Sequence, residues 1–546
     1  MCGIHATISP SDAPSLDQDL ERRLRNRGPD HLGTVRAQLD DVPCPLALTF
    51  ISTVLSLRGD HVAKQPLVDA KTRSVLCWNG EAWRIRGQGL AGNDTEAVLD
   101  LLLKASLSRS ESSHDPVLEA LRTVEGPFAF IYFDRPSKCL YYGRDRLGRR
   151  SLLVNAKDPF TLSSIPESLS DDWAEVEADG CYKLELDNAA FSRMSPTRHP
   201  WVEDDSLVSS IGVFNTTLPT APFHLSQDSA SVQQLHQHLI ESLEARVLDI
   251  PLPPGAGDSD ARMAVLFSGG LDCTVLARVA SEIVPSGQPI DLINVAFENP
   301  RIASQHPGHS KEQLYELCPD RITGRKAFVE LLETCPRRAW RFVTVNVPYT
   351  DTTAHRGEVV RLIHPHNTEM DLSIANALYF AARGQGSALV AADSDPQPYQ
   401  TTARVLLSGL GADELFGGYS RHGAAFSRGG YAGLVDELKL DVSRLGKRNL
   451  GRDDRVMAHW GREVRFPFLD ERLVKWAMEL PAWEKCDFGS PETLSHLDPE
   501  KRVLRLLART LGLLSVAGEK KRAIQFGART AKMESGRVKG TTSISP

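Results

Sequence analysis

The chain lacks the features that mark secreted, membrane or nucleic-acid-binding proteins. Its nine cysteines are scattered, without a CxxC pair, at positions 2, 44, 77, 139, 181, 273, 318, 335 and 486, which is typical of reduced thiols rather than of a disulfide framework or a zinc site. No apolar run reaches the ~18 residues of a membrane span, and acidic residues interrupt the N-terminus before a signal peptide could form. The net charge of −7 argues against general nucleic-acid binding. We expect a cytoplasmic protein that binds neither membrane nor nucleic acid.

The stretch from Met263 to Leu276 carries the first chemical signal. Its apolar start predicts a short buried strand, Ser268-Gly269-Gly270 a turn, and the spacing from Leu271 onward a helix. A strand that ends in glycines before a helix gathers free N–H groups and a helix dipole, which suit phosphate. A glycine turn alone is common in α/β proteins, and the lysine of the GxxxxGK[ST] loop is missing.

The string SGGLDC, residues 268 to 273, resembles the pyrophosphate-binding loop of ATP pyrophosphatases. A second string, VLLSGLGADELFGGY at residues 405 to 419, resembles a motif of asparagine synthetase, although acidic residues at a helix start also act as simple caps. The resemblance implies that Asp272 and Asp413 bind Mg²⁺ from two strand ends. The basic string at 520 to 522 contributes Lys521, and otherwise reads as a solvated face. The ATP-binding residues implied are Leu266, Ser268, Gly269, Gly270, Leu271, Asp272, Cys273, Phe297, Ser408, Gly409 and Lys521.

The N-terminus carries a second set of motifs. Removal of Met1 would leave Cys2 with its α-amino group, whose pKa of roughly 7.7–8.0 suits a base for the thiol. Polar strings follow in order at residues 25–30, 78–81, 93–96, 125–130 and 142–148. Together they resemble the class II glutamine amidotransferase domain. The resemblance implies Cys2 as the nucleophile, Asn79 and Gly80 as the oxyanion hole, and Asp94 as the carboxylate for the α-ammonium of glutamine. Glu81 and, from its position nearby, Arg58 complete the predicted glutamine-binding set.

Two positions depart from the family pattern. Val54 stands where the family usually has an arginine for the α-carboxylate of glutamine, and only Arg58, four positions further on, offers a replacement. Leu410 stands where asparagine synthetase has a glutamate that serves as general base, and leucine transfers no proton. The segment from His364 to Asp371 also differs from the usual aspartate-recognition segment.

The motifs and the length of 546 residues predict an α/β protein with two catalytic domains. Residues 2–192 are expected to form an N-terminal-nucleophile αββα sandwich and 193–229 a linker. Residues 230–532 are expected to form a doubly wound parallel sheet of the ATP-pyrophosphatase type with C-terminal helices, and 533–546 a disordered tail. The string EVRFPFLD, residues 463 to 470, is interpreted as an apolar plug with an Arg–Glu framework.

Three functions remain open on the sequence. The first is a glutamine-dependent, ATP-dependent amidotransferase that resembles asparagine synthetase, with glutamine, ATP, Mg²⁺ and a small carboxylate as its partners and aspartate as the default acceptor. The second is a non-catalytic scaffold that keeps the fold and binds ATP, motivated by Val54 and Leu410. The third keeps the adenylation and changes the acceptor. The oligomeric state is not predicted.

Overall fold

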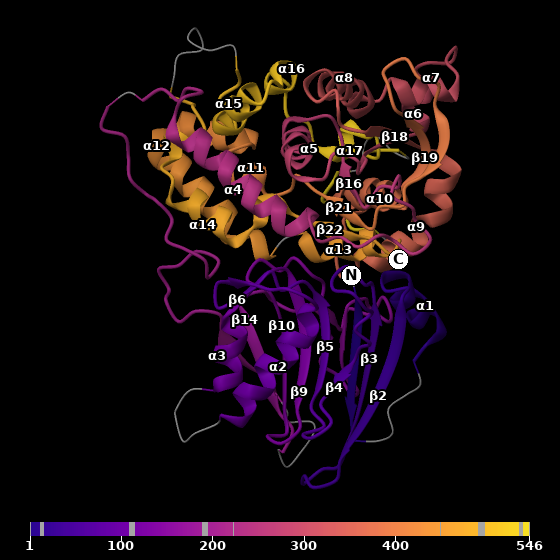
Figure 1. The fold of residues 1–546 in the computed structure, drawn as a ribbon, viewed down its shortest axis with the longest axis vertical. Helices are drawn as coiled ribbons and strands as arrows, with labels where there is room; N and C mark the ends of the chain where they lie inside the picture. Colours follow the sequence, from indigo (N-terminus) through magenta and orange to yellow (C-terminus); the bar gives the residue numbers. More distant parts are fainter. Residues whose placement is uncertain are drawn as a thin grey trace.

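A computed structural model describes residues 2–10, 16–108, 115–187, 195–221, 223–447, 449–489, 497–533 and 539–544 of the chain. Two sheets of the N-terminal part form the lower half of the molecule, and a third large sheet with most of the helices forms the upper half (Figure 1). The strand β22 and the helix α13 lie near the boundary between the halves.

The N-terminal half is a sandwich of two six-stranded antiparallel sheets. The first sheet has the order β13 (Trp173–Glu175), β11 (Leu153–Asn155), β12 (Phe160–Ser163), β1 (Gly3–Ser9), β3 (Leu46–Val54) and β2 (His31–Leu39). The second has the order β15 (Thr197–Pro200), β14 (Gly180–Glu185), β10 (Cys139–Arg144), β9 (Phe128–Asp134), β5 (Val75–Gly80) and β4 (Leu67–Val68). A small third sheet joins β7 (Gln88–Gly89), β6 (Arg84–Ile85) and β8 (Val124–Glu125).

The sequence FAFIYFD of β9 shows why the sandwich has helices outside it. Side chains alternate along a strand, and both alternating sets of β9 are buried. Ile131 and Phe133 belong to the core between the sheets, whereas Phe130 and Tyr132 pack with residues of α2 (Asp94–Leu107) and α3 (Pro116–Arg122). The helix α1 (Gln18–Arg27) lies against β1 and β3. The predicted αββα sandwich is confirmed.

The sandwich extends beyond its predicted end. Residues 197–200 were expected in the linker, but they form β15 and pair antiparallel with β14. Residues 533–546 were predicted to be a disordered tail, but residues 540–544, which the structure describes, make contacts with the rest of the chain. The backbone amides of Glu369 and Met370 donate to the carbonyls of Thr542 and Gly540, and Ile544 is buried. These contacts tie residues 540–544 to the start of α10 (Glu369–Arg383).

The upper half is built on a seven-stranded sheet, as the alternation of strands and helices predicts. Its order is β20 (Gln397–Gln400), β19 (Gln385–Leu389), β18 (Trp340–Val347), β17 (Ile290–Phe297), β16 (Met263–Leu266), β21 (Val405–Leu407) and β22 (Glu463–Arg465). The five strands from β18 to β22 along this order are parallel. The chain moves outward from β16 in one direction to β17 and β18, and in the other to β21 and β22. The crevice between the ends of β16 and β21 is therefore the switch point at which such sheets bind ligands.

Helices cover this sheet. The helix α5 begins directly after the glycine turn that follows β16, and α13 packs on α10. Within the described residues, no helix combines the length and the apolar character that crossing a membrane requires. The helices are α4 (Ala230–Val247), α5 (Leu271–Ile283), α6 (Pro300–Ala303), α7 (Lys311–Glu316), α8 (Pro319–Thr334), α9 (Tyr349–Ile363), α11 (Ala412–Phe416), α12 (Ser420–Ser443), α13 (Leu450–Ala458), α14 (Glu471–Glu479), α15 (Arg502–Thr510), α16 (Leu514–Ala517) and α17 (Ile524–Gly527).

Candidate active sites

A cavity of about 500 Å³ opens at the switch point. This volume is within the range of small-molecule sites. The loops after β16 and β21 and the C-terminal segment around residues 519–525 form its walls. Of the predicted ATP-binding residues, nine line this one cavity: Leu266, Ser268, Gly270, Leu271, Asp272, Cys273, Ser408, Gly409 and Lys521.

Two predicted residues are placed elsewhere. The backbone amide of Phe297 donates to the carbonyl of Ala528, and the ring packs edge-on against Phe380. On the same strand it is Val295, and not Phe297, that lines the cavity. Gly269 turns toward α8 with φ +80°, and a Cβ there would lie 2.4 Å from the amide nitrogen of Gly324.

Glycines let the two loops approach each other. A Cβ on Gly409 would lie 2.8 Å from the Cβ of Asp272, and one on Gly418 would lie 2.0 Å from Oδ1 of Asp413. Both distances are shorter than a carbon contact allows. The SG and GG pairs of the second string therefore allow its acidic residue to reach the first loop.

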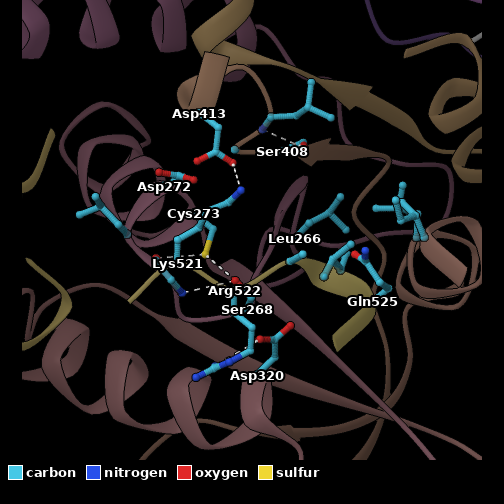
Figure 2. A pocket seen from close by; sticks show the side chains of 18 of the residues that line it. Leu266, Ser268, Asp272, Cys273, Asp320, Ser408, Asp413, Lys521, Arg522 and Gln525 are labelled. Carbon is cyan, nitrogen blue, oxygen red and sulfur yellow. Dashed lines mark hydrogen bonds and ion pairs between the residues drawn. The ribbon is translucent and has the colours of Figure 1, made fainter. Parts of the chain in front are cut away.

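Asp272 and Asp413 converge on one point, which Lys501 occupies. The Lys501 ammonium lies 2.7 Å from Oδ1 and 2.8 Å from Oδ2 of Asp272, and 2.9 Å from Oδ1 of Asp413. Lys521 lies 3.2 Å from the other oxygen of Asp413 and 3.9 Å from the centre of the Tyr419 ring. Figure 2 shows the two carboxylates side by side at one end of the cavity, with Asp320 at the far end. Two acids and two lysines thus form one charge cluster.

The charges in this cluster depend on each other. Burial disfavours the ammonium of Lys501, but Asp272 and Asp413 together raise its pKa, so it stays protonated. Burial also disfavours the carboxylate of Asp413, yet Lys501 and Lys521 hold its pKa below the usual value. The pKa of Asp272 is raised by burial in spite of Lys501. Asp413 is therefore the more firmly ionised of the two acids.

The position of the Lys501 ammonium tests whether a divalent cation fits. A cation at that point reaches both carboxylates, and among the described residues no third acid, histidine or cysteine joins them. Mg²⁺ in phosphoryl-transfer sites is held by one or two carboxylates, with phosphate oxygens and water completing the octahedron. The residues present fit this requirement: Asp272 and Asp413 would hold the ion, which would neutralise phosphate charge.

Replacement of Lys501 by methionine is expected to make the protein depend on Mg²⁺ for stability. The variant leaves two adjacent acids with only Lys521, so the free energy of unfolding at pH 8 should fall by about 3 kcal/mol. Millimolar Mg²⁺ should recover most of this loss in the variant and have little effect on the wild-type protein. Urea unfolding with and without MgCl₂ measures both.

Lys520→Met provides the matched control, because Lys520 directly precedes Lys521 in the sequence and is exposed. It should unfold like the wild-type protein at either Mg²⁺ concentration. A Lys501→Met protein that ignores Mg²⁺ would mean that the two carboxylates do not form a cation site.

The far end of the cavity holds an acid that the sequence did not single out. Asp320, in the first turn of α8, is buried, and its nearest cation is Arg522 at 3.9 Å. Burial raises the pKa of Asp320 to about 7, against the pull of Arg522. The carboxyl group therefore titrates near neutral pH inside the cavity.

The other candidate site lies at the N-terminus of the sandwich. Cys2 is buried just before β1, and burial raises the pKa of its thiol. The side-chain amide of Gln65 donates to Sγ of Cys2 at 3.7 Å and accepts from the amide of Trp78 at 2.8 Å. Gln65 thus links Cys2, the predicted nucleophile, to the strand that carries the predicted oxyanion hole. The sequence analysis did not identify Gln65, which is one polar residue in an otherwise unremarked loop.

Asn79 and Gly80 have the features that an oxyanion hole needs. Asn79 at the end of β5 is fully buried, and neither its Nδ2 nor its Oδ1 has a hydrogen-bond partner among the described residues. An unpaired buried amide is costly and is available to a ligand. Gly80 has φ +146°, and a Cβ there would lie 2.0 Å from the carbonyl oxygen of Pro127. Only glycine fits this position.

The predicted glutamine-binding residues come together around Glu81. Asp94 accepts from the indole of Trp78 at 3.2 Å and from the amide of Ala82 at 2.8 Å. Arg58 lies 3.5 Å from Glu81. Two buried acids near each other suit an ammonium group.

Arg58 is less free than its predicted role requires. Its three nitrogens donate to the carbonyls of Ala82, Leu90 and Gly92, which leaves few donors for a substrate carboxylate. Val54 ends β3, buried, and its carbonyl accepts from the amide of Asp30. The hydrogen bonds of Arg58 therefore join the segment after β5, at Ala82, to the loop at residues 90–92. Leu410 is partly buried and lines the cavity at the switch point, to which it adds an apolar side chain.

Comparison with known proteins identifies both halves. The glutamine amidotransferase domain family matches residues 1–185, and the asparagine synthase family matches residues 399–436 and 428–540. The chain is 34% identical to asparagine synthetase domain-containing protein 1 of Bos taurus over 99% of this chain and 97% of that protein. It is 32% identical to an asparagine synthetase domain-containing protein of Saccharomyces cerevisiae (89% and 84%) and 22% identical to the glutamine-hydrolysing asparagine synthetase of Sandersonia aurantiaca (90% and 81%).

A sandwich of two antiparallel sheets with Cys2 just before its first strand, joined to a second half that the asparagine synthase family matches, places the chain among the asparagine synthetase-like glutamine amidotransferases. Identity at this level over the whole length goes further than the class. The chain belongs to the family of asparagine synthetase domain-containing proteins.

Proposed function

We propose that the protein is a glutamine-dependent, ATP-consuming amidotransferase that converts a small carboxylate into its amide through an acyl-adenylate. The acceptor carboxylate attacks the α-phosphorus of ATP, and pyrophosphate leaves. Ammonia then attacks the acyl carbon, and AMP leaves with the proton going to water or a nearby base. Aspartate, with asparagine as product, is the default acceptor, and the cytoplasm is the proposed location.

One observation carries this proposal: the carboxylates of Asp272 and Asp413 both contact the ammonium of Lys501 at the switch point, with Lys521 beside them. A site with this charge pattern suits a triphosphate, since the amides of the glycine loop bind oxygens and the lysines offset the charge of the leaving pyrophosphate. Mg²⁺ between the carboxylates would supply further charge neutralisation.

The proposed glutamine chemistry rests on Cys2. Loss of Met1 would leave an α-amine to take the thiol proton, and the thiolate would attack the side-chain amide of glutamine. The unpaired amide of Asn79 and the N–H of Gly80 support stabilisation of the oxyanion. Ammonia leaves, and water hydrolyses the resulting thioester to glutamate.

The acceptor is the open part of the proposal. Leu410 lines the cavity together with the buried Leu450 and Met457, and the charged Arg452 and Asp453 line it as well, so the lining fits both aspartate and a less polar carboxylate. ATP–pyrophosphate exchange across a panel of small carboxylates, with aspartate as the reference, tests it. We expect exchange with one of them. A protein that is stabilised by ATP and Mg²⁺ but exchanges pyrophosphate with none would favour the non-catalytic scaffold.

A further inference from the structure

The strand β22 lies on the edge of the parallel sheet that faces the sandwich, and it serves both halves. Leu407 of β21 pairs with Arg465 of β22, and the amide of Ser408 donates to the carbonyl of Arg465 at 3.0 Å. The backbone of Arg465 therefore supports the start of the second nucleotide loop.

The side chain of Arg465 extends into the other catalytic site. Its Nε donates to Oε1 of Glu463 at 2.6 Å, one terminal nitrogen donates to the carbonyl of Arg246 at 2.6 Å, and the other donates to Oε1 of Glu81 at 3.2 Å. The guanidinium also lies 5.0 Å from the centre of the Trp83 ring. With 4% of the side chain exposed, every nitrogen of Arg465 is engaged.

Glu81 depends on this contact for its orientation. Its Oε2 has no hydrogen-bond partner among the described residues and lies 3.5 Å from Arg58. Burial, with Glu463 and Asp94 nearby, raises the pKa of Glu81 to about 8, while Arg465 and Arg58 oppose the rise. Removal of Arg465 would thus both free the carboxylate and favour its neutral form.

A second line of buried charges joins the same strand to the nucleophile. Glu463 lies 3.3 Å from Arg150, which lies 3.7 Å from Asp454. Asp454 accepts from Arg27 at 2.7 Å, and Nε of Arg27 donates to the carbonyl of Cys2 at 3.3 Å. The two charged residues of β22 therefore reach the candidate glutamine site from two sides.

We propose that Arg465 is a positioning residue for glutamine binding, supplied by the ATP-binding half to the glutaminase half. It holds the Glu81 carboxyl group, directly after Asn79 and Gly80, at the angle that receives the α-ammonium of glutamine. This inference rests on the proposed glutaminase function.

The test compares Arg465→Met and Arg465→Lys with the wild-type protein in two assays. One measures KM and kcat for glutamine in glutamate formation, and the other measures pyrophosphate release driven by ammonium. KM for glutamine should rise about tenfold in Arg465→Met, the loss of one charge-assisted hydrogen bond, and less in Arg465→Lys, which keeps the charge. Ammonium-driven pyrophosphate release should stay near wild type in both. In Arg465→Met the pH profile of kcat/KM for glutamine should move to higher pH, because Glu81 would keep its proton to a higher pH.

Arg472→Met is the matched control. Arg472 also crosses the interface, to the carbonyl of Gly87 at 3.2 Å and to Glu125 at 3.8 Å, but it is half-exposed and ends outside the site. Its KM for glutamine should equal that of the wild type. If Arg465→Met does not fold, Arg465→Lys carries the test, since one ammonium cannot serve three acceptors on different sides.

The outcomes separate the inference from the function on which it rests. A wild-type protein that forms no glutamate overturns both. A wild-type protein that forms glutamate, with an unchanged KM in both Arg465 variants, overturns the inference alone. Equal losses of glutamine-driven and ammonium-driven activity would show that Arg465 only holds the two halves together, and would also overturn it.

Discussion

Cys2→Ala will abolish the reaction with glutamine and spare the reaction with ammonium. Without a thiolate no thioester forms, so glutamate production should fall at least ~10³-fold. The parallel sheet and its carboxylates lie in the other half of the molecule, so ammonium-driven pyrophosphate release should continue at the wild-type rate. Glutamate and pyrophosphate are measured in the same samples, with either glutamine or ammonium chloride as the nitrogen source.

Cys139→Ala controls for the loss of a buried thiol. Cys139 is buried in β10, in the other sheet of the sandwich from Cys2. The variant should keep both activities. Equal glutamate production by Cys2→Ala and Cys139→Ala would contradict the assignment of the nucleophile.

Asp413→Asn will have the opposite pattern. Asparagine keeps the shape of the side chain but removes the charge that faces Lys501 and Lys521. Pyrophosphate release should therefore fall about 10³-fold with either nitrogen source, which corresponds to several kcal/mol of lost electrostatic stabilisation. Glutamine hydrolysis at Cys2 should persist. Initial rates at saturating ATP and MgCl₂ measure the effect.

Asp436→Asn removes an acid from the exposed side of α12 and should change neither rate. A rate of pyrophosphate release that is the same in Asp413→Asn and Asp436→Asn would rule out a role of Asp413 in the chemistry. Loss of glutamine hydrolysis in Asp413→Asn would instead indicate that the substitution disturbs the whole fold.

The strand–turn–helix shape of the loop between β16 and α5 could be predicted from the sequence because its determinants are local. A buried strand, two glycines and an acid within a few positions fix both the turn and the direction of Asp272. The same holds for the start of α2, which Asn93 caps by accepting from the amide of Glu96. Gly80 and Gly409, by contrast, face residues of other motifs, the carbonyl of Pro127 and the Cβ of Asp272, so the need for glycine at these positions follows only from the fold.

Lys501 could not be predicted because nothing near it in the sequence points to Asp272. The two are 229 positions apart, and Lys501 reaches the acids from a residue with φ +50° just before α15. The position of Phe297 outside the cavity lining has the same origin, since the carbonyl that accepts from its amide, that of Ala528, comes from the C-terminal segment. Contacts between distant segments also explain the ordered residues 540–544.

The two catalytic halves could be identified separately from the sequence, but their connection could not. The string EVRFPFLD was expected to provide an Arg–Glu framework, and the ion pair of Arg465 with Glu463 agrees with that interpretation. That the same guanidinium ends on Glu81 of the other half follows only from the packing of β22 against the sandwich.

The central claim is that one chain releases ammonia at Cys2 and consumes it at the cavity between Asp272 and Asp413. Its most direct measurement is the ratio of glutamate to pyrophosphate formed from glutamine, ATP, Mg²⁺ and the acceptor found in the exchange panel. We predict that the two products form together in a ratio near one and that omission of ATP stops pyrophosphate entirely. Glutamate formation without any pyrophosphate, for every acceptor tested, would contradict the account.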